Sequence, residues 1–417
     1  MPFAWCFCRS GARKNPVRFC LVSVGRARVS FPAGKRAVVG RRICSLAWMY
    51  GSMRWGDDMQ PVLAGISAFR FHRIPPQVLG LLPPVSQERD YGRGKLYGHP
   101  LVTESLGLPL VCLTDERRTR TGAANISWAL VRGEMPFGSV LESELGVSVT
   151  SPAMTLLTLA RRLSLTRLVM AVYEMVGYFS IYAPSKAMES LLASGPLAGF
   201  GAWRRVVDAK GGASDLWQRM PLVDTGSLAG FCRQESNLYG AKKLAKAVGL
   251  VNGAVASPLE ARLTAMLTLP RRMGGCALKG LANNKAVRLD ASQSSVAGQG
   301  VCHVDLYHEG AERGRPLAIE CQGLLVHGSA QKLLADADRA LALQRAGCEV
   351  LQVTHKQIKD PDGYRELTRL IADRTGCPTA TRRLCAPRIA CVMNCFPTGN
   401  LCSISGACLS KNGDCKR

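Results

Sequence analysis

Apolar and polar positions in the C-terminal third of the chain follow first a helical and then a strand periodicity. Ser257 and Pro258 precede an apolar stretch, and Glu260 stands three residues after the serine, a capping-box pattern that opens a helix. Further along, alternation of apolar and polar residues predicts strands. In chain order, we expect a helix over 258–269, strands over 301–308 and 316–322, a helix over 329–346, a strand over 349–354 and a helix over 361–374.

The patterns upstream are shorter and less regular. Ser151 and Pro152 repeat the helix-start signal, and leucines follow them at helical spacing. Residues 60–110 are rich in Pro, Gly and Leu and show no sustained period. For the rest, we expect a small β-rich unit over 109–149, helices over 165–179, 225–235 and 240–248, and a glycine-rich connector over 194–215.

Composition places these patterns in a globular α/β protein. Hydrophobic residues make up 47% of the 417 residues and charged residues 20%, which excludes wholesale disorder, collagen and coiled coil. No apolar run approaches the ~18–20 residues of a membrane helix, so we expect no membrane partner. We expect a C-terminal core, in which helices flank a mixed sheet, preceded by a smaller α+β domain. The segments are a leader (1–59), an α+β region (60–193), a connector with helices (194–250), the C-terminal core (251–376) and a tail (377–417).

The net charge of +24 favours a polyanionic partner, with nucleic acid as the leading class. This charge is unevenly distributed. Residues 1–55 contain 11 basic residues and no acidic ones, whereas 251–376 contain 16 basic and 13 acidic residues, a balance of +3. The overall charge therefore says little about the C-terminal core.

Cysteines concentrate at the two ends of the chain. Six lie in the last 33 residues, but their closest pair, Cys391 and Cys395, is too widely spaced for a CxxC zinc motif. We interpret both ends as poorly ordered appendages; the alternative for the tail is a structural metal site. The leader (1–59) is interpreted as disordered or as lying before the true start, with Met53 or Met59 as later starting points.

Two carboxylates in the predicted strands form the main chemical signal. By alternation, Val304 and Leu306 share one face of their strand and Asp305 takes the other, while Glu320 and Gln322 project together from theirs. If the two strands pair antiparallel, Asp305 and Glu320 converge. A divalent cation relieves the repulsion between two such carboxylates, and hard oxygen ligands favour Mg²⁺ or Mn²⁺. Such a site suits phosphodiester hydrolysis.

Asp305 followed by Glu320-Cys321-Gln322, in this order of elements, resembles the core of the PD-(D/E)XK nuclease superfamily. More closely, Glu320 to Gly323, His327-Gly328 and the later segment 336–354 resemble the branch related to the very-short-patch-repair endonuclease. The resemblance covers about 256–376. It implies a restriction-endonuclease-like fold and a cytoplasmic, metal-dependent DNA endonuclease of bacterial defence or repair type.

The resemblance assigns a role to each matching residue. Asp305 and Glu320 match the metal-binding acids, and Glu260 matches the helical acid that many members place near the metal. Gln322 stands where the motif has Lys, so it can form hydrogen bonds but carries no charge. His327 matches a position from which a histidine can assist proton transfer.

Each of these positions also has a purely structural interpretation. Glu260 can serve only as the capping residue of its helix, and Asp305 with Glu320 can be a solvated strand face. His327 can be an ordinary loop residue. For the helix expected over 329–346, we interpret Asp336, Asp338 and Arg339 as a polar face with local ion pairs.

The run Leu145 to Pro152 with its leucine-rich helix resembles the abortive-infection AbiEi-like antitoxin family over about 109–182. This resemblance implies DNA binding and a cognate toxin–antitoxin partner. Two alternatives to the endonuclease therefore stay open. One is a catalytically inactive DNA-binding regulator or antitoxin-like protein on a nuclease fold. The other is an interaction protein stabilised by zinc in the cysteine-rich tail.

Overall fold

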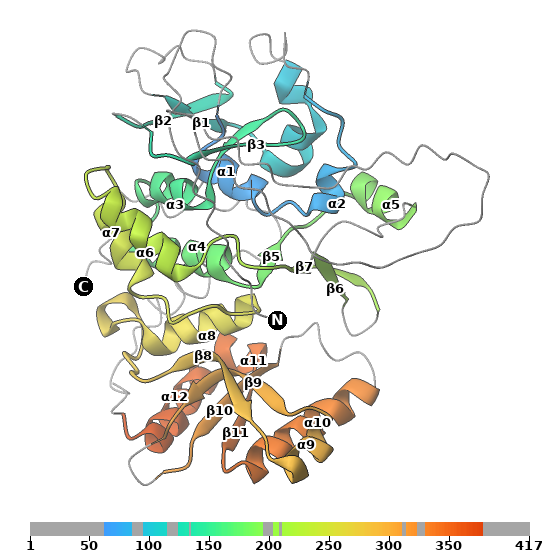
Figure 1. The fold of residues 1–417 in the computed structure, drawn as a ribbon, viewed down its shortest axis with the longest axis vertical. Coiled ribbons are helices and arrows are strands. Elements are labelled where there is room, and N and C mark those ends of the chain that lie inside the picture. The colour runs from blue at the N-terminus through green and yellow to red at the C-terminus, as the bar shows by residue number, and fades with distance from the viewer. Residues whose placement is uncertain are drawn as a thin grey trace, which may run out of the picture. The chain divides into compact units, whose positions relative to one another are not determined.

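The computed structural model is a mixed α/β protein (Figure 1). The described residues are 62–85, 95–114, 124–132, 135–194, 203–207, 211–310, 314–322 and 330–377, and they belong to one compact unit. The leader, His327 and the tail beyond Cys377 lie outside them, so the predictions for those segments stay predictions. In the described part of the chain, no helix combines the length and apolarity needed to cross a membrane.

A four-stranded sheet forms the centre of the C-terminal part. Its strands are β8 (Ala282–Arg288), β9 (Val301–His308), β10 (Leu317–Gln322) and β11 (Glu349–Thr354), in the spatial order β11-β10-β9-β8. Strands β8, β9 and β10 pair antiparallel, whereas β10 and β11 run parallel. A parallel pair needs a crossover connection, and α10 (Ala330–Arg345) supplies it.

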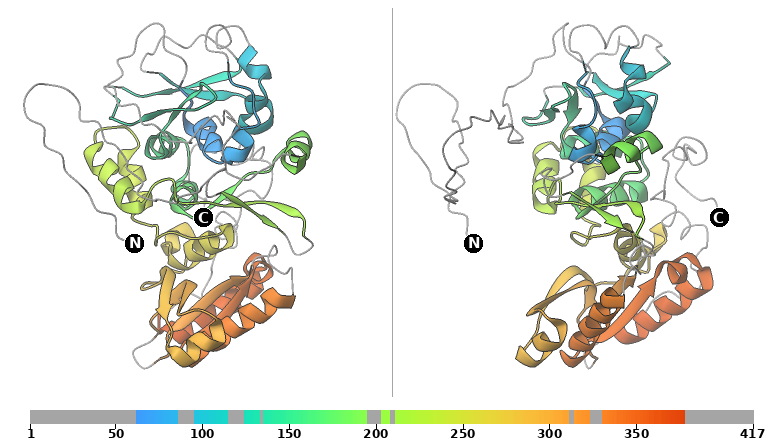
Figure 2. Two further views of the ribbon diagram at one scale, coloured as in Figure 1. Left: turned by 45° about the vertical axis from the view of Figure 1, so that its right-hand side comes forward. Right: turned by 90° about the vertical axis from the view of Figure 1, so that its right-hand side faces the viewer.

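Helices cover both faces of this sheet (Figures 1 and 2). On one face, Leu306 and Ile319 share a hydrophobic cluster with α8 (Pro258–Thr268) and α12 (Pro361–Thr375). On the other face, Ala318 packs in a smaller cluster with Leu343 of α10 and with α9 (Ala291–Ala297). The hydroxyl of Tyr364 donates to the carbonyl of Met266 at 3.1 Å and thereby joins α12 to α8. The short helix α11 (His355–Lys359) directly follows β11.

The strands and helices predicted for 258–374 are confirmed to within two residues, but one detail of β9 was wrong. Val304 and Leu306 do not share a face, since Leu306 belongs to the cluster under α8 and Val304 to the one under α10. The cause lies in the neighbouring strand. The β8–β9 pairing omits one position between Asn283–Leu306 and Lys285–Val304, where Asn284 adopts a left-handed φ of 50°. The strict alternation is broken there, next to Asp305.

Upstream of α8, the described strands form three smaller sheets. β1 (Leu110–Thr114) pairs parallel with β2 (Ile126–Leu130), and β3 (Val140–Glu142) pairs antiparallel with β4 (Ser148–Thr150). β7 (Ala213–Gln218) lies between β5 (Phe179–Ile181) and β6 (Arg204–Val207). The helical elements of this part are α1 (Gly65–Phe71), α2 (Pro76–Leu79), η1 (Lys95–Gly98), η2 (Leu101–Leu106), α3 (Pro152–Ala160), α4 (Leu165–Val176), α5 (Lys186–Ser194), α6 (Thr225–Gln234), α7 (Ala241–Val248) and, after α8, η3 (Arg271–Met273).

The predicted helix starts rest on serine caps. The Ser151 hydroxyl accepts from the N–H of Met154 at the start of α3, and the Ser257 hydroxyl accepts from the N–H of Glu260 at the start of α8. Both helices place proline at their first position, where the missing N–H costs no helical hydrogen bond.

Other upstream predictions need correction. The helix expected over 165–179 ends at Val176, because Gly177 is extended, with φ −89° and ψ 168°. Glycine fits this position, where a Cβ would lie 2.6 Å from the carbonyl oxygen of Tyr173. The connector expected over 194–215 contains β6 and the start of β7, and the region without a period, 60–110, contains several short helices. Strand β8 and helices α5, α9 and α11 were not predicted from the sequence.

Candidate carboxylate site

Asp305 and Glu320 lie at the point where the pairing of β9 with β10 ends. The ladder runs from His308–Leu317 to Leu306–Ile319, and the next residue on each strand is one of the two acids. The predicted antiparallel pairing is therefore confirmed, and it brings these two carboxylates into one neighbourhood.

Asp305 is held by the backbone of the neighbouring strand. Its Oδ2 accepts a hydrogen bond from the N–H of Cys321 at 2.8 Å, so a side chain continues the link between the strands. Burial raises the pKa of Asp305, while the Cys321 hydrogen bond and the charge of Arg339 oppose that rise.

Glu260 brings a third carboxylate from α8. Its Oε2 accepts from the N–H of Ala256 at 2.7 Å, so it does stabilise the helix start, through the backbone of the residue before the cap. The residue is only 5% exposed. Burial, followed by the negative charge of Asp305, raises the pKa of Glu260 to about 8. Glu260, Asp305 and Glu320 together are called the carboxylate cluster below.

Glu320 has one cationic partner among the described residues, Arg339 of α10. Nη2 of Arg339 lies 3.1 Å from both carboxylate oxygens of Glu320 and also donates to the backbone carbonyl of His303 on β9. The interpretation of Arg339 as part of a polar face with local ion pairs was wrong: α10 packs on the sheet and directs Arg339 to Glu320 and His303 on two strands. Burial, followed by the charge of Asp305, raises the pKa of Glu320 to about 7, and Arg339 opposes this rise.

Two further side chains complete the electrostatics of the cluster. The charge of Asp336, one turn before Arg339 on α10, contributes to raising the pKa of both Asp305 and Glu320. Burial and the neighbouring carboxylates raise the pKa of the Cys321 thiol well above its ordinary range. Cys321 is thus a protonated, unreactive thiol rather than a nucleophile.

Gln322 stands two residues beyond Glu320, at the end of β10, and is paired in register with Thr354 of β11. It is partly buried, so an uncharged side chain occupies this position beside the cluster. Nearby, burial and the positive charges of Arg262 and Lys359 lower the pKa of His355, the first residue of α11. Neither Arg262 nor His355 was predicted as a site residue, because no spacing in the sequence indicates that the two lie close together.

The donor set of the cluster suits a hard divalent cation. Its atoms are carboxylate oxygens, and burial, followed by the negative charge of Asp305, raises the pKa values of Glu260 and Glu320. Across the described ranges, no group of three or more His, Cys, Asp or Glu has the arrangement of a ready-made metal site. Mg²⁺ usually keeps several waters and needs only one or two protein carboxylates, so Asp305 and Glu320 fit this requirement.

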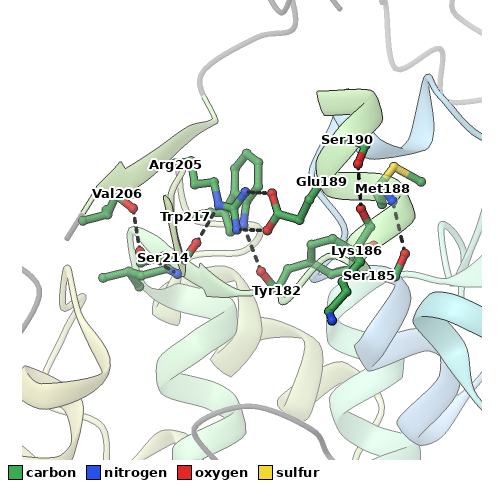
Figure 3. Close-up of polar contacts among 11 residues, drawn as sticks. Tyr182, Ser185, Lys186, Met188, Glu189, Ser190, Arg205, Val206, Ser214 and Trp217 are labelled. Atoms are coloured by element: carbon green, nitrogen blue, oxygen red, sulfur yellow. Dashed lines mark hydrogen bonds and ion pairs between the residues drawn. The ribbon is translucent and has the colours of Figure 1, made fainter. Parts of the chain in front are cut away.

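A second polar cluster links α5 to the β6–β7 hairpin (Figure 3). Arg205 donates through Nη1 and Nη2 to the two oxygens of Glu189, each at 2.6 Å, and through Nε to the carbonyl of Ser214 at 2.6 Å. Its guanidinium lies 5.4 Å from the ring centre of Trp217. All three nitrogens of Arg205 have partners, so this cluster is structural.

Comparison of the chain with protein families, curated proteins and solved structures gives no match. The carboxylate cluster and its surroundings are therefore interpreted from their own geometry.

Proposed function

We propose that the protein is a metal-dependent DNA endonuclease-like protein of bacterial defence or repair type. The observation that carries the proposal is the convergence of Glu260, Asp305 and Glu320 from a helix and two antiparallel strands. The order of α8, β9, β10, α10 and β11 also supports a PD-(D/E)XK-like core within 251–376.

In this proposal, Asp305 and Glu320 hold Mg²⁺ or Mn²⁺, and Glu260 lies beside them. A bound cation of this kind polarises a phosphate oxygen and lowers the pKa of water. The Cys321 N–H keeps the Asp305 carboxylate in place. Gln322 orients water or a phosphate oxygen by hydrogen bonding, and His327 assists proton transfer. Glu260, whose pKa burial raises in the metal-free protein, acts as an acid or base beside the site.

The proposal includes partners for the rest of the chain. DNA is the substrate, and the AbiEi-like resemblance of the α+β region (60–193) adds a cognate toxin–antitoxin partner. Both partners are bacterial and intracellular, so the proposed location is the cytoplasm.

A second candidate is a catalytically inactive DNA-binding regulator that uses the same fold. Two observations favour it. Gln322 lacks the charge that stabilises a transition state, and the Glu320 carboxylate already has an ion-pair partner, Arg339. Such a protein would bind DNA in a salt-sensitive manner without cleaving it.

The deciding experiment is nicking of supercoiled plasmid with Mg²⁺ or Mn²⁺ by the full chain. We compare the natural protein with Asp305→Asn, whose amide oxygen can still accept from Cys321. The matched control is Asp338→Asn, which changes an exposed acid of α10 outside the cluster. Nicking that only Asp305→Asn abolishes supports the endonuclease. DNA binding without nicking by any of the three supports the regulator, and equal nicking by all three overturns the site.

A further inference from the structure

Arg339 contacts Glu320 in an incomplete manner. Only Nη2 reaches the carboxylate, at 3.1 Å from each oxygen, and the same nitrogen also serves the His303 carbonyl. Nε of Arg339 is buried and has no hydrogen-bond partner among the described residues. The stronger arginine–carboxylate pairs present two parallel N–H groups to the two oxygens, and Arg339 does not.

The Arg205–Glu189 pair shows what a complete contact looks like in the same chain. There, two nitrogens donate to two oxygens at 2.6 Å and Nε has its own acceptor. Relative to this pair, Arg339 makes longer contacts with its carboxylate and leaves a buried donor unsatisfied, which costs free energy. The Arg339–Glu320 contact is therefore the weaker of the two and easier to exchange.

A divalent cation would compete for the same two oxygens. Such a cation carries twice the charge of a guanidinium and approaches carboxylate oxygen to about 2.0–2.1 Å for Mg²⁺, so its attraction to Glu320 exceeds that of Arg339. Nη2 of Arg339 lies 3.1 Å from both oxygens of Glu320, in the place that a cation shared by these two oxygens would take, so the two compete for it. Arg339 remains nearby because its second contact, to His303, does not involve the carboxylate.

We propose that Arg339 is a displaceable counter-ion that regulates metal binding: it holds Glu320 in the metal-free protein and releases that carboxylate to the incoming cation. The inference rests on the metal site of the proposed function. A counter-ion role and a positioning role of Arg339 predict opposite effects on metal affinity. A residue that oriented Glu320 for the metal would strengthen metal binding, whereas a competing counter-ion weakens it.

The test is a calorimetric titration of the full chain with Mn²⁺ at pH 8. We expect Arg339→Met to bind Mn²⁺ about fivefold or more tightly than the natural protein, a coupling of ordinary size. Arg345→Met is the matched control, because it removes the same charge from an exposed position on the same helix. Its affinity should equal that of the natural protein. In a Glu320→Gln background, Arg339→Met should have no effect, because the carboxylate for which it competes is gone.

Each outcome separates the inference from the proposed function. Weaker or unchanged Mn²⁺ binding by Arg339→Met overturns the inference, as does equal tightening by Arg345→Met or the absence of Mn²⁺ binding in every variant. If Arg339→Met binds Mn²⁺ more tightly as expected but plasmid nicking is absent, the result supports the counter-ion role and contradicts the endonuclease. If the natural chain nicks DNA while Arg339→Met binds Mn²⁺ more weakly, the result supports the endonuclease and contradicts the counter-ion role. Metal-free thermal unfolding of each variant confirms that it is folded.

Discussion

The carboxylate of Asp305 on β9 accepts a hydrogen bond from the backbone N–H of Cys321 on β10, at 2.8 Å, just beyond the last paired residues of the two strands. This contact gives a partly buried N–H its acceptor and fixes the carboxylate beside Glu320. The side chain of Asp305 therefore has two separable properties, an acceptor oxygen and a negative charge.

Replacing Asp305 by asparagine or by alanine separates these two properties. Asp305→Asn keeps an acceptor for Cys321 and removes charge repulsion, so we expect metal-free protein at pH 8 to be at least as stable as the natural chain. Asp305→Ala leaves the Cys321 N–H without its acceptor, which should cost about 1–3 kcal/mol. Urea unfolding with a chelator measures both changes. Equal destabilisation by the two substitutions would mean that the hydrogen bond is not what stabilises this position.

The carboxylate cluster should make metal-free stability fall as pH rises from about 4.5 to 8. Unfolded Glu260 releases its proton near pH 4.5, whereas in the folded protein its pKa is about 8. Between these values the folded state binds more protons, so the free energy of unfolding decreases with increasing pH, by up to about 1.4 kcal/mol per pH unit for one such group. Glu320, with a pKa of about 7, acts in the same direction.

Glu260→Gln should make this pH dependence shallower, because its amide cannot lose a proton while its oxygen can still accept from Ala256. Urea unfolding at pH 5, 6, 7 and 8 measures the slope. Glu366→Gln, on the exposed side of α12, is the control and should keep the natural slope. A slope that Glu260→Gln leaves unchanged would contradict the raised pKa.

A buried ion pair should dominate the stability of the upstream part. Arg73 donates through Nε to Glu174 at 2.6 Å, and both side chains are almost fully buried. Glu174→Gln would leave the charge of Arg73 buried without its counter-ion, which typically costs about 3–5 kcal/mol. The same change at Glu189, a partly exposed partner of Arg205, should cost about 1 kcal/mol or less. Urea unfolding of the two variants measures both losses of stability, and equal losses would contradict the role of burial.

The parts of the fold that could be predicted are those with an apolar pattern or a cap. Ser257 and Pro258 mark the start of α8, and alternation marks β9 and β10, because one or both faces of each strand are buried. β8 (Ala282–Arg288) could not be found in this way. It is an edge strand without a single fully buried residue, so its sequence has no apolar alternation.

In the carboxylate cluster, too, local sequence patterns predict some contacts and not others. The proximity of Asp305 to Glu320 follows from the antiparallel pairing of two strands that the sequence marks, because each acid directly adjoins the last paired residues. The contact of Arg339 with Glu320 depends on how a crossover helix packs on the sheet, and no spacing in the sequence encodes that geometry. The break in alternation at Asp305 was equally hidden, because its origin is the left-handed φ of Asn284 on a neighbouring strand.

Restoring the missing charge at Gln322 should increase catalysis if the proposed function holds. A lysine there would project from the end of β10, two residues after Glu320, and could stabilise negative charge that develops on the phosphate. We expect Gln322→Lys to raise the rate of Mn²⁺-dependent plasmid nicking about tenfold or more, the size of effect that one well-placed charged group has in catalysis. Gln344→Lys, at an exposed position of α10, adds the same charge outside the site and should leave the rate unchanged. A similar gain from both variants would indicate general DNA attraction rather than catalysis, and no gain from Gln322→Lys would favour the inactive regulator.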